Sequence, residues 1–497
     1  MDALHEVVKK HWGYTSLRPL QHEAMTAALE GRDALVVLPT GGGKSICYQA
    51  PALLSDKLTV VVSPLIALMK DQVDQLIQRG VPAAFLNSSL DAEDRRRVAD
   101  GVPRGAYKLI FVAPERFAGD GFYRLLERSN VGSFAIDEAH CISHWGHDFR
   151  ADYRRLGELK KRFPTVGVHG FTATATPRVR DDIIAQLGLK DAAVLVGDFF
   201  RPNLAYRATQ RGYAFEDVLG VIRQRPGKAG LVYCIRRADV DEMTGMLKSA
   251  GVKTVGYHAG MTDEERTRAQ DAFTAGSIDV VVATVAFGMG IDRPDIRFVI
   301  HAAMPKSLEH YQQETGRAGR DGQPADCILF YSWGDVELWQ SIIKKNAGDN
   351  HKDQVRMLSE MHAFCTAMTC RHRKLVTYFG QSWELTSCGA CDVCSGTRDT
   401  LPDSSILAQK IMSCVVRTGE RYGPAYVVDV LRGVPTEKVL ERGHDKLSTF
   451  SLIPDQPKPV LMRWIDQLVD QGLMEREAEY RVLSVTLQGW DVLRSKA

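Results

Sequence analysis

The sequence has almost no excess charge of either sign. Its 63 Lys and Arg residues oppose 61 Asp and Glu residues, which leaves a formal net charge of +2. Residues 401–497 carry 13 basic and 13 acidic residues, so this part also lacks the basic excess of a simple electrostatic clamp for nucleic acid. Any affinity for nucleic acid must therefore come from the local arrangement of side chains.

Long apolar runs are also missing, and so is the cysteine pattern of a secreted disulfide scaffold. Residues 1–11 contain no apolar core of a signal peptide, and no run approaches the roughly 20 apolar residues that span a bilayer. Three of the ten cysteines fall within CGACDVC (388–394), which favours metal chemistry over a secreted disulfide framework. We expect a cytoplasmic protein in a reducing compartment, with no membrane partner.

The sequence contains enough apolar residues to build several packed domains, since 44% of its 497 residues are hydrophobic. Short β-branched runs alternate with amphipathic stretches, as in a parallel sheet covered by helices. In DQVDQLIQRG (71–80), Val73, Leu76 and Ile77 share a helical face and Gly80 is placed to end the helix. The runs predicted as strands of this first domain are 34–38, 58–64, 109–114 and 134–137.

The same alternation begins again after the turn-forming FFRPN (199–203), which predicts a second α/β domain. Beyond about residue 333 the pattern changes to helices, with 338–346 and 355–365 as examples, and then to the cysteine cluster. Residues 401–497 contain two or three helical patterns and end in a strand-like run at 481–490. The strands predicted for the second domain are 230–234, 253–258, 279–285 and 298–302.

The strongest local motif is LPTGGGKS (38–45), which lies between a predicted strand and a predicted helix. Glycines in this setting let backbone N–H groups surround phosphates. Lys44 is placed to pair with the β- and γ-phosphates of ATP, and Ser45 to offer its hydroxyl to Mg²⁺. Leu38 stands where the standard phosphate loop has a glycine, so the match is to the helicase variant of the loop. The alternative is a glycine-rich turn with a surface lysine. The loop residues predicted to bind nucleotide are Thr40, Gly41, Gly42, Gly43, Lys44 and Ser45.

A pair of carboxylates follows in FAIDEAHC (134–141), at the end of a predicted buried strand. Ligand sites of open α/β sheets lie at such strand ends. Asp137 is predicted to hold Mg²⁺, and Glu138 to orient and deprotonate the attacking water. An acidic pair at a strand end can equally be a solvated turn or the N-terminal region of a helix, and the phosphate loop argues against that alternative.

Together with these two motifs, an ordered set of longer strings resembles the RecQ family of DNA helicases, with the bacterial type of catalytic core. The resemblance extends across nearly all 497 residues. It implies two tandem RecA-like parallel-sheet motor domains (1–199 and 200–332), a helical zinc-binding module (333–400) and a winged-helix domain (401–497). The strings are WGYTSLRPLQ (12–21), LPTGGGKSICYQ (38–49), VVSPLIALMKDQVDQL (61–76), APERF (113–117), DEAHCISHWGHDFR (137–150), FTATAT (171–176), VATVAFGMGID (282–292) and QETGRAGRDG (313–322).

The resemblance also implies roles in nucleotide binding and hydrolysis. Tyr14 resembles the aromatic residue that stacks on adenine, and Arg18 and Gln21 resemble residues that contact the base, which suits the edge of adenine. Arg317 and Arg320 resemble arginine fingers, and their spacing allows both to emerge from one helical turn at the start of an element. A surface salt-bridge pair is the ordinary alternative for two such arginines.

For DNA binding, the resemblance points to the loop SHWGHDFR (143–150), which couples DNA binding to ATP hydrolysis in this family. Aromatic side chains can stack on bases, although they could instead fill a gap between domains. Ser63 and Thr284 are expected to contact phosphates with little sequence preference. The loop residues predicted to contact DNA are Trp145, His147, Phe149 and Arg150.

The pattern C-x17-C-x2-C-x2-C predicts a closed site for a structural Zn²⁺, because four thiolates leave no open position for water. Cys365, His362 and His372 are alternatives for the fourth ligand, and the family resemblance selects Cys370. The other cysteines, at 47, 141, 234, 327 and 414, are expected to be small buried hydrophobic residues. The predicted zinc ligands are Cys370, Cys388, Cys391 and Cys394.

The C-terminal segment, which includes RGHDKLSTF (442–450), resembles the winged-helix domain of the family that docks on duplex DNA. A hairpin at 478–481 with Tyr480 is predicted to wedge the first base pair. No further helical domain follows Ala497, so we expect either that this member lacks it or that the sequence is a fragment. The side chains expected to touch phosphates here are Arg417, Arg421, Lys446 and Arg463.

These observations predict an ATP- and Mg²⁺-dependent helicase, with structural Zn²⁺, that moves 3′ to 5′ along single-stranded DNA and unwinds duplex DNA in repair and recombination. Its expected partners are DNA, with single-strand-binding and repair proteins as candidates, and its expected location is the cytoplasm, on the nucleoid. One alternative is an RNA-remodelling ATPase, because the motor motifs do not detect the 2′-hydroxyl. Another is a non-catalytic protein that binds DNA structures, which the intact motor residues argue against.

Overall fold

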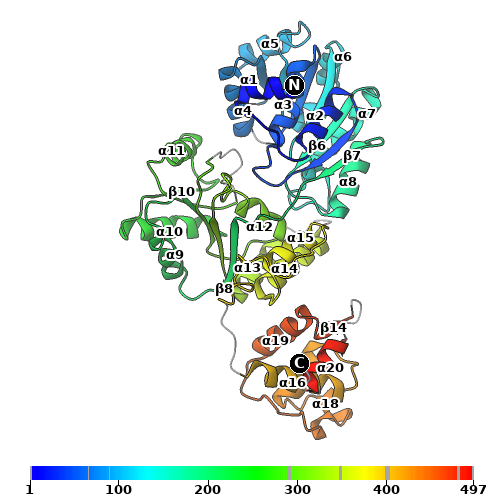
Figure 1. Cartoon of the computed structure of the whole chain (residues 1–497), viewed down its shortest axis with the longest axis vertical. Coiled ribbons are helices and arrows are strands. Elements are labelled where there is room, and N and C mark those ends of the chain that lie inside the picture. Colours follow the sequence, from blue (N-terminus) through cyan, green and yellow to red (C-terminus); the bar gives the residue numbers. More distant parts are fainter. Residues whose placement is uncertain are drawn as a thin grey trace. The chain divides into compact units, whose positions relative to one another are not determined.

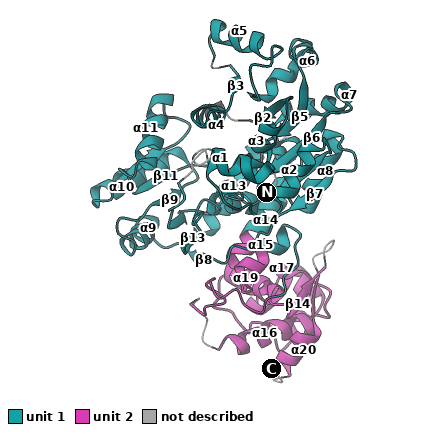
Figure 2. Ribbon diagram, turned by 45° about the horizontal axis from the view of Figure 1, so that its top comes forward, with its two compact units in different colours: residues 1–205, 209–361, 375–384 teal, residues 206–208, 362–374, 385–497 magenta. Residues whose placement is uncertain are grey.

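The protein is described from a computed structural model that covers residues 3–64, 66–88, 90–285, 287, 293–345, 350–397, 403–477 and 482–494. Its contacts divide the chain into two compact units (Figures 1 and 2). Unit 1 contains residues 1–205, 209–361 and 375–384, and unit 2 contains residues 206–208, 362–374 and 385–497. In the described part of the chain, no helix is both long enough and apolar enough to cross a membrane.

The first α/β half of unit 1 is a seven-stranded sheet in the order β3-β4-β2-β5-β6-β1-β7, and every strand pair in it is parallel. Its central strands are apolar and buried along their whole length, because helices cover both faces. The strands are β1 (Ala34–Val37), β2 (Leu58–Val62), β3 (Ala83–Leu86), β4 (Leu109–Val112), β5 (Val131–Ile136), β6 (Gly167–Thr172) and β7 (Ala193–Val196). The α-helices are α1 (Ala3–Trp12), α2 (Gln21–Leu29), α3 (Lys44–Leu54), α4 (Ile66–Gln78), α5 (Ala92–Gly101), α6 (Asp120–Glu127), α7 (Leu159–Arg162) and α8 (Pro177–Leu187).

The second half of unit 1 is a six-stranded sheet in the order β10-β11-β9-β12-β13-β8. The pairs from β10 through β13 are parallel. Both sheets therefore have the predicted α/β architecture. The strands are β8 (Leu204–Gln210), β9 (Gly230–Tyr233), β10 (Thr254–Tyr257), β11 (Val280–Ala283), β12 (Phe298–His301) and β13 (Ala325–Tyr331). The helices of this half and of the segment that follows it are α9 (Ala214–Arg223), α10 (Arg237–Ser249), α11 (Asp263–Thr274), α12 (Leu308–Thr315), α13 (Trp333–Lys345), α14 (His351–Thr366) and α15 (Arg371–Tyr378).

Unit 2 joins the cysteine cluster to a small helical core with a two-stranded antiparallel sheet, in which Met474 pairs with Val485. The two strands flank the predicted hairpin, whose residues 478–481, including Tyr480, lie outside the described residues. The elements of the helical core are α16 (Ser404–Arg417), α17 (Pro424–Arg432), α18 (Glu437–Glu441), α19 (Lys458–Asp470), β14 (Met474–Arg476), β15 (Leu483–Val485) and α20 (Leu487–Leu493).

Two local predictions are wrong. Ile77 does not share the buried face of α4, because Met69, Val73 and Leu76 form the buried stripe while Ile77 is 55% exposed beside it. The strand-like run at 481–490 is a strand only at its beginning. Thr486 ends it, because its hydroxyl accepts a hydrogen bond from the Gly489 N–H and caps α20.

Candidate functional site

The predicted phosphate loop connects β1 to α3 and favours glycine at two positions. A Cβ at Gly42 would lie 2.8 Å from the Pro39 carbonyl oxygen, and one at Gly43 would lie 2.3 Å from Gln21 Nε2. Gly43 has a φ of 77° and precedes the first residue of α3, Lys44. The loop thus presents its backbone at the N-terminus of an eleven-residue helix, which favours a bound phosphate.

Within the predicted base-binding group, Gln21 contacts the phosphate loop directly. Its Nε2 donates to the carbonyl oxygens of Gly42 and Gly43 at 3.3 and 3.2 Å. Its Oε1 accepts from the Arg18 N–H at 2.8 Å, which ties the Arg18 segment to the same position. Tyr14 is 59% exposed, so its ring is accessible for stacking.

Lys44 and the two predicted catalytic carboxylates form one buried electrostatic group. The ammonium group of Lys44 donates to the Leu38 carbonyl oxygen at 3.3 Å. Burial lowers the pKa of Lys44, while Glu138 and Asp137 act in the opposite direction. Burial and the neighbouring Glu138 raise the pKa of Asp137 to about 7. A divalent cation beside Asp137 would lower its pKa and so oppose the effects of burial and Glu138 on this carboxyl. This donor set therefore fits Mg²⁺.

Glu138 follows β5 in a left-handed backbone conformation, with a φ of 47°. This conformation is costly for a residue with a side chain, and it occurs where surrounding structure imposes it at a functional position. His140 Nδ1 lies 3.3 Å from Glu138 Oε2 and 2.9 Å from Thr172 Oγ1. The backbone carbonyl of Asp137 accepts a hydrogen bond from the buried Tyr153 hydroxyl at 2.9 Å.

The loop that carries Arg317 and Arg320 lies against the phosphate loop. A Cβ at Gly41 would be 3.2 Å from Arg320 Cγ, and one at Gly316 would be 2.7 Å from Thr40 Cβ. Arg317 is 5% exposed and, like Arg320, acts electrostatically on the buried Tyr233. Both arginines follow the C-terminal end of α12, so the prediction that they begin an element is wrong. The helix ends at Thr315 and Gly316 starts the turn that holds both of them.

The aromatic-rich loop (143–150) is held by contacts inside unit 1. The Arg178 guanidinium lies 3.2 Å from the ring centroid of Trp145, and Phe149 packs on His144 at 4.0 Å. Arg150 donates to Asp148 Oδ2 from Nε and Nη2 and to the Pro64 carbonyl oxygen from Nη1. The predicted DNA contacts therefore already have protein partners in this conformation.

Histidine rings continue from the DEAH sequence to the second sheet. His147 stacks on His140 with ring centroids 4.3 Å apart and meets His310 of α12 edge-on at 4.6 Å. A cavity of about 220 Å³ opens beside these rings, and Glu138, Asp148 and Lys306 also line it. His310 and Lys306 were not predicted from the sequence, since neither belongs to a motif with its own chemical meaning.

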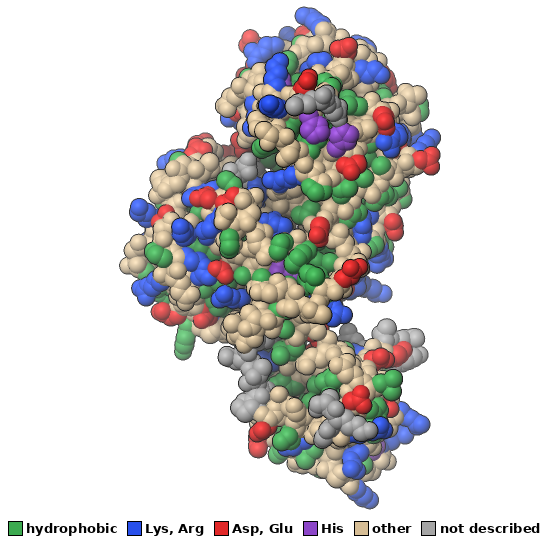
Figure 3. Space-filling view, viewed as in Figure 1, with side chains coloured by type: hydrophobic (Ala, Val, Ile, Leu, Met, Phe, Trp, Pro, Cys, Tyr) green, Lys and Arg blue, Asp and Glu red, His purple; other side chains and the backbone are tan. Residues whose placement is uncertain are grey.

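The two predicted phosphate contacts outside this loop differ in accessibility. Ser63 is fully buried at the end of β2, and within the described residues its hydroxyl has no hydrogen-bond partner. Thr284 follows β11, is half-buried, and donates its N–H to the Tyr257 carbonyl oxygen. On the face seen in Figure 3, basic and acidic side chains are interspersed, so charge does not mark a DNA path on that face.

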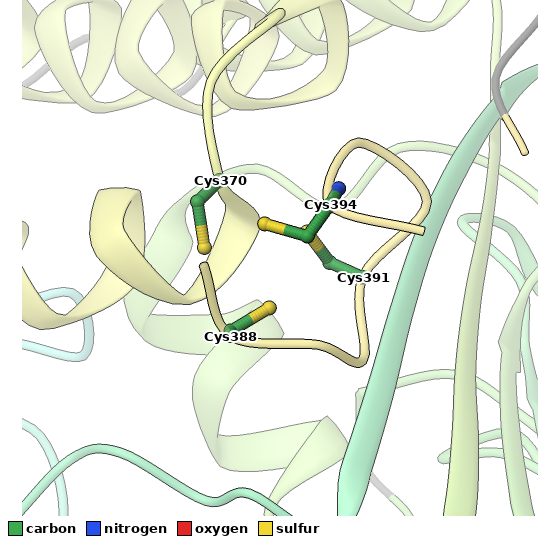
Figure 4. A group of neighbouring side chains, drawn as sticks. All are labelled: Cys370, Cys388, Cys391 and Cys394. Carbon is green, nitrogen blue, oxygen red and sulfur yellow. The ribbon is translucent and has the colours of Figure 1, made fainter. Parts of the chain in front are cut away.

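The four predicted zinc ligands come together in unit 2. The sulfur atoms of Cys370, Cys388, Cys391 and Cys394 all lie within 4.8 Å of one another and point toward a common centre (Figure 4). Backbone N–H groups of Ala390 and Cys394 donate to the sulfurs of Cys388 and Cys391. The hydrogen bond between Cys370 and Cys391 lowers the pKa of Cys391 and raises that of Cys370, so the pair shares its proton unequally before a metal binds. This donor set fits a tetrahedral Zn²⁺.

A buried ion pair fixes the same cluster. The Arg371 guanidinium, which is fully buried, donates to both carboxylate oxygens of Asp392 at 2.9 and 3.1 Å. Asp392 also accepts from the N–H of Ala208 in β8.

The basic residues predicted to touch phosphates lie in the helical core of unit 2. Arg417, Arg421 and Lys446 are exposed, whereas Arg463 is half-buried.

Comparison with known proteins agrees with this arrangement. Family models match four successive segments: DEAD/DEAH box helicase at 18–183, helicase conserved C-terminal domain at 213–322, RecQ zinc-binding at 333–395 and RQC domain at 399–497. The crystal structure of the DUF1998 helicase MrfA bound to DNA has a similar fold, with a TM-score of 0.58 at 17% identity over 74% of this chain and 57% of that chain.

Curated relatives show the family. The chain is 42% identical to the ATP-dependent DNA helicase RecQ of Haemophilus influenzae over 95% of its own length and 76% of the relative. It is 38% identical to the protein of the same name in Bacillus subtilis, over 98% of its length and 83% of the relative. With these matches, two parallel-sheet halves and a four-cysteine cluster, the chain belongs to the RecQ family of helicases.

Proposed function

We propose that the chain is an ATP-dependent DNA helicase that moves 3′ to 5′ along single-stranded DNA and unwinds duplex DNA in repair and recombination. One observation carries the proposal: the phosphate loop of the first sheet, with Lys44 beside Asp137 and Glu138, lies against the Arg320 loop of the second sheet. The named relatives are DNA helicases, and the motor fold turns ATP hydrolysis into domain movement.

Each residue at this site has a specific role in the proposal. The backbone from Thr40 to Ser45 and the Lys44 ammonium group hold the phosphates, while Gln21 keeps the loop in shape and Tyr14 and Arg18 hold the base. Ser45 and Asp137 would hold Mg²⁺, which would draw electron density from the γ-phosphate when bound. Glu138 takes the proton of the attacking water as its oxygen bonds to the γ-phosphorus and the bond to the leaving oxygen breaks.

The Arg317 and Arg320 loop provides the link between chemistry and movement. The two guanidinium groups balance the charge that develops on the phosphoryl oxygens, an effect that can contribute about 10³–10⁵ in rate. This effect requires Gly316 to touch Thr40 and Arg320 to touch Gly41, so hydrolysis occurs only while the two sheets are closed on each other. Release of the products then lets the sheets separate and the DNA advance.

The aromatic-rich loop links DNA to this cycle. An incoming base competes with Arg178 for the ring of Trp145 and with His144 for the ring of Phe149, at about 1–3 kcal/mol per stacked base. Arg150, Thr284 and, after a local opening, Ser63 contact phosphates. Movement of His147 on the ring of His140 carries the change to Glu138.

Structural Zn²⁺ held by Cys370, Cys388, Cys391 and Cys394 completes the proposal. With four thiolates it has no open position, so it stabilises unit 2 rather than reacting. None of the ten cysteines, all of which are described, forms a disulfide. We place the chain on the nucleoid because its proposed substrate is DNA. Its partnership with single-strand-binding and repair proteins stays a prediction.

An ATPase assay separates the proposed roles. Lys44→Ala should lose ATP binding, whereas Glu138→Gln should bind ATP and hydrolyse it at least about 100-fold more slowly. In the parent protein, single-stranded DNA should stimulate hydrolysis more than RNA of the same sequence. Equal stimulation by RNA would favour an RNA-remodelling ATPase, and DNA binding without any hydrolysis would contradict the motor assignment.

A further inference from the structure

A second set of metal-ligating side chains lies beside the catalytic carboxylates. His140, Cys141 and Asp148 each place one ligand atom within 4.8 Å of the other two. Cys141 Sγ is 3.8 Å from His140 Nε2 and 4.0 Å from Asp148 Oδ2. With zinc bond lengths, a tetrahedral sulfur ligand stands about 3.6 Å from a nitrogen or oxygen ligand, so these two pairs need to close by only a few tenths of an ångström.

The hydrogen bonds of His140 leave its Nε2 free to ligate. The Thr172 hydroxyl donates to the Thr174 carbonyl oxygen, so it accepts from His140 Nδ1, 2.9 Å away. Glu138 Oε2 lies 3.3 Å from the same Nδ1. The proton is therefore on Nδ1 and the lone pair of Nε2 faces Cys141. A carboxylate behind a ligating histidine is also the arrangement that orients the ring and raises its basicity in zinc sites.

The surroundings allow a fourth ligand and limit the affinity. His140, Cys141 and Asp148 line the cavity of about 220 Å³, which has space for a water ligand. Arg150 pairs with Asp148 Oδ2, and Lys306 lines the same cavity. These positive charges oppose a bound cation, so binding here must be weaker than at the four-cysteine cluster. A thiol and an imidazole favour zinc-like ions over Mg²⁺.

We propose that His140, Cys141 and Asp148 form a second metal site, which takes one divalent cation of the zinc class and joins the two ends of the aromatic-rich loop. His140 and Cys141 lie just before this loop, separated from it by Ile142, and Asp148 lies near its end. A bound cation holds the loop in the described conformation, with Trp145 under Arg178. The effect on catalysis rests on the proposed function: zinc suppresses the stimulation of ATP hydrolysis by DNA.

Zinc stoichiometry tests the site itself, independently of any activity. The full chain, with its four-cysteine cluster loaded, is dialysed against buffered Zn²⁺, and bound metal is measured for the parent, Cys141→Ser, Cys141→Ala and Cys327→Ser. Cys327 is a matched control, since it is fully buried and belongs to no metal-ligating group in the described part of the chain. We expect one additional equivalent in the parent and in Cys327→Ser, and none in either Cys141 variant.

Equal zinc content in all four folded proteins would overturn the site. Melting curves identify a variant that fails to fold, and Cys141→Ala provides a second comparison because it only shortens the side chain.

The ATPase assay, with Mg²⁺ in excess, then tests the effect of zinc on the aromatic-rich loop. Zinc should reduce DNA stimulation at least about 10-fold more in the parent than in Cys141→Ser. Equal inhibition would overturn the loop effect, while failure of DNA to stimulate the parent without zinc would count against the proposed function alone.

Discussion

Gly316→Ala provides a sharp test of the contact between the two motor sheets. Gly316 has φ and ψ of −60° and −10°, which alanine adopts without dihedral strain, but its new Cβ would also stand 2.9 Å from the Gln312 carbonyl oxygen. The new methyl group would stand 2.7 Å from Thr40 Cβ and 3.0 Å from Thr40 Oγ1. Carbon atoms in contact stay about 3.5–4.0 Å apart, so the Arg320 loop must withdraw from the phosphate loop by roughly 1 Å.

This withdrawal should affect catalysis and leave ATP binding nearly intact. A displacement of about 1 Å in a catalytic group can cost about 10²-fold in rate, so we expect kcat for DNA-stimulated ATP hydrolysis to fall about 100-fold. Binding of a fluorescent ATP analogue should change less than about 3-fold, because Lys44 and the loop backbone remain in place. Steady-state hydrolysis and nucleotide titration measure the two quantities.

Gly245→Ala is the matched control. Gly245 lies inside α10 with nothing within 4 Å of its Cβ position, so alanine should stabilise the fold by about 0.5–1 kcal/mol and leave kcat unchanged. Parental kcat in Gly316→Ala would refute the view that this contact belongs to the hydrolysing state. A loss of ATP binding as large as the loss of kcat would refute the assignment of Gly316 to catalysis.

Three further predictions concern stability and coupling. Because the pKa of Asp137 is raised to about 7, the folded chain binds this proton more tightly than the unfolded chain, and the parent loses stability as pH rises from about 4 to 8. Nucleotide-free Asp137→Asn should therefore melt above the parent at pH 8, with no difference near pH 4; the opposite order would contradict this. Arg371→Ala should lower the free energy of unfolding by about 3–5 kcal/mol in urea, because it leaves a buried carboxylate unpaired, against less than about 1 kcal/mol for the exposed Arg236→Ala. Similar losses in both variants would be inconsistent with a buried pair. His310→Ala should reduce DNA stimulation of the ATPase about 2–10-fold through loss of the ring contact with His147, with ATP affinity unchanged and with His310→Phe as the retaining control. Unchanged stimulation in His310→Ala would remove this contact from the coupling.

The sequence predicted several strands whose residues are apolar and buried on both faces, although it did not predict β13, which is largely apolar and buried. β1 and β2 consist of such residues, and the alternation with helices gave the α/β class. β6 was not predicted, since Gly167, His169 and Gly170 interrupt its apolar pattern. His169 can be buried there because its ring bonds to Ser133 Oγ and to the Arg32 carbonyl oxygen. Those partners are distant in sequence, so composition alone does not reveal them.

The candidate site was predictable residue by residue but not as an arrangement. Motifs located Lys44, Glu138 and Arg320 because their chemistry demands those residue types at those spacings. The approach of Gly316 to Thr40 depends on how one sheet packs against another, which local patterns do not encode. The position of Arg320 after α12 was not predicted for a similar reason. In the sequence, a glycine such as Gly316 can either end a helix or lie in a loop that precedes one.

Strand separation tests the central claim most directly. The parent protein and Glu138→Gln are incubated with ATP and Mg²⁺ on DNA duplexes that carry a 3′ or a 5′ single-stranded tail, and on an RNA duplex with a 3′ tail. The account predicts release of the strand by the parent from the 3′-tailed DNA, with little from the other two substrates and none with Glu138→Gln. Equal release by Glu138→Gln, or release from RNA but not from DNA, would contradict an ATP-driven DNA helicase.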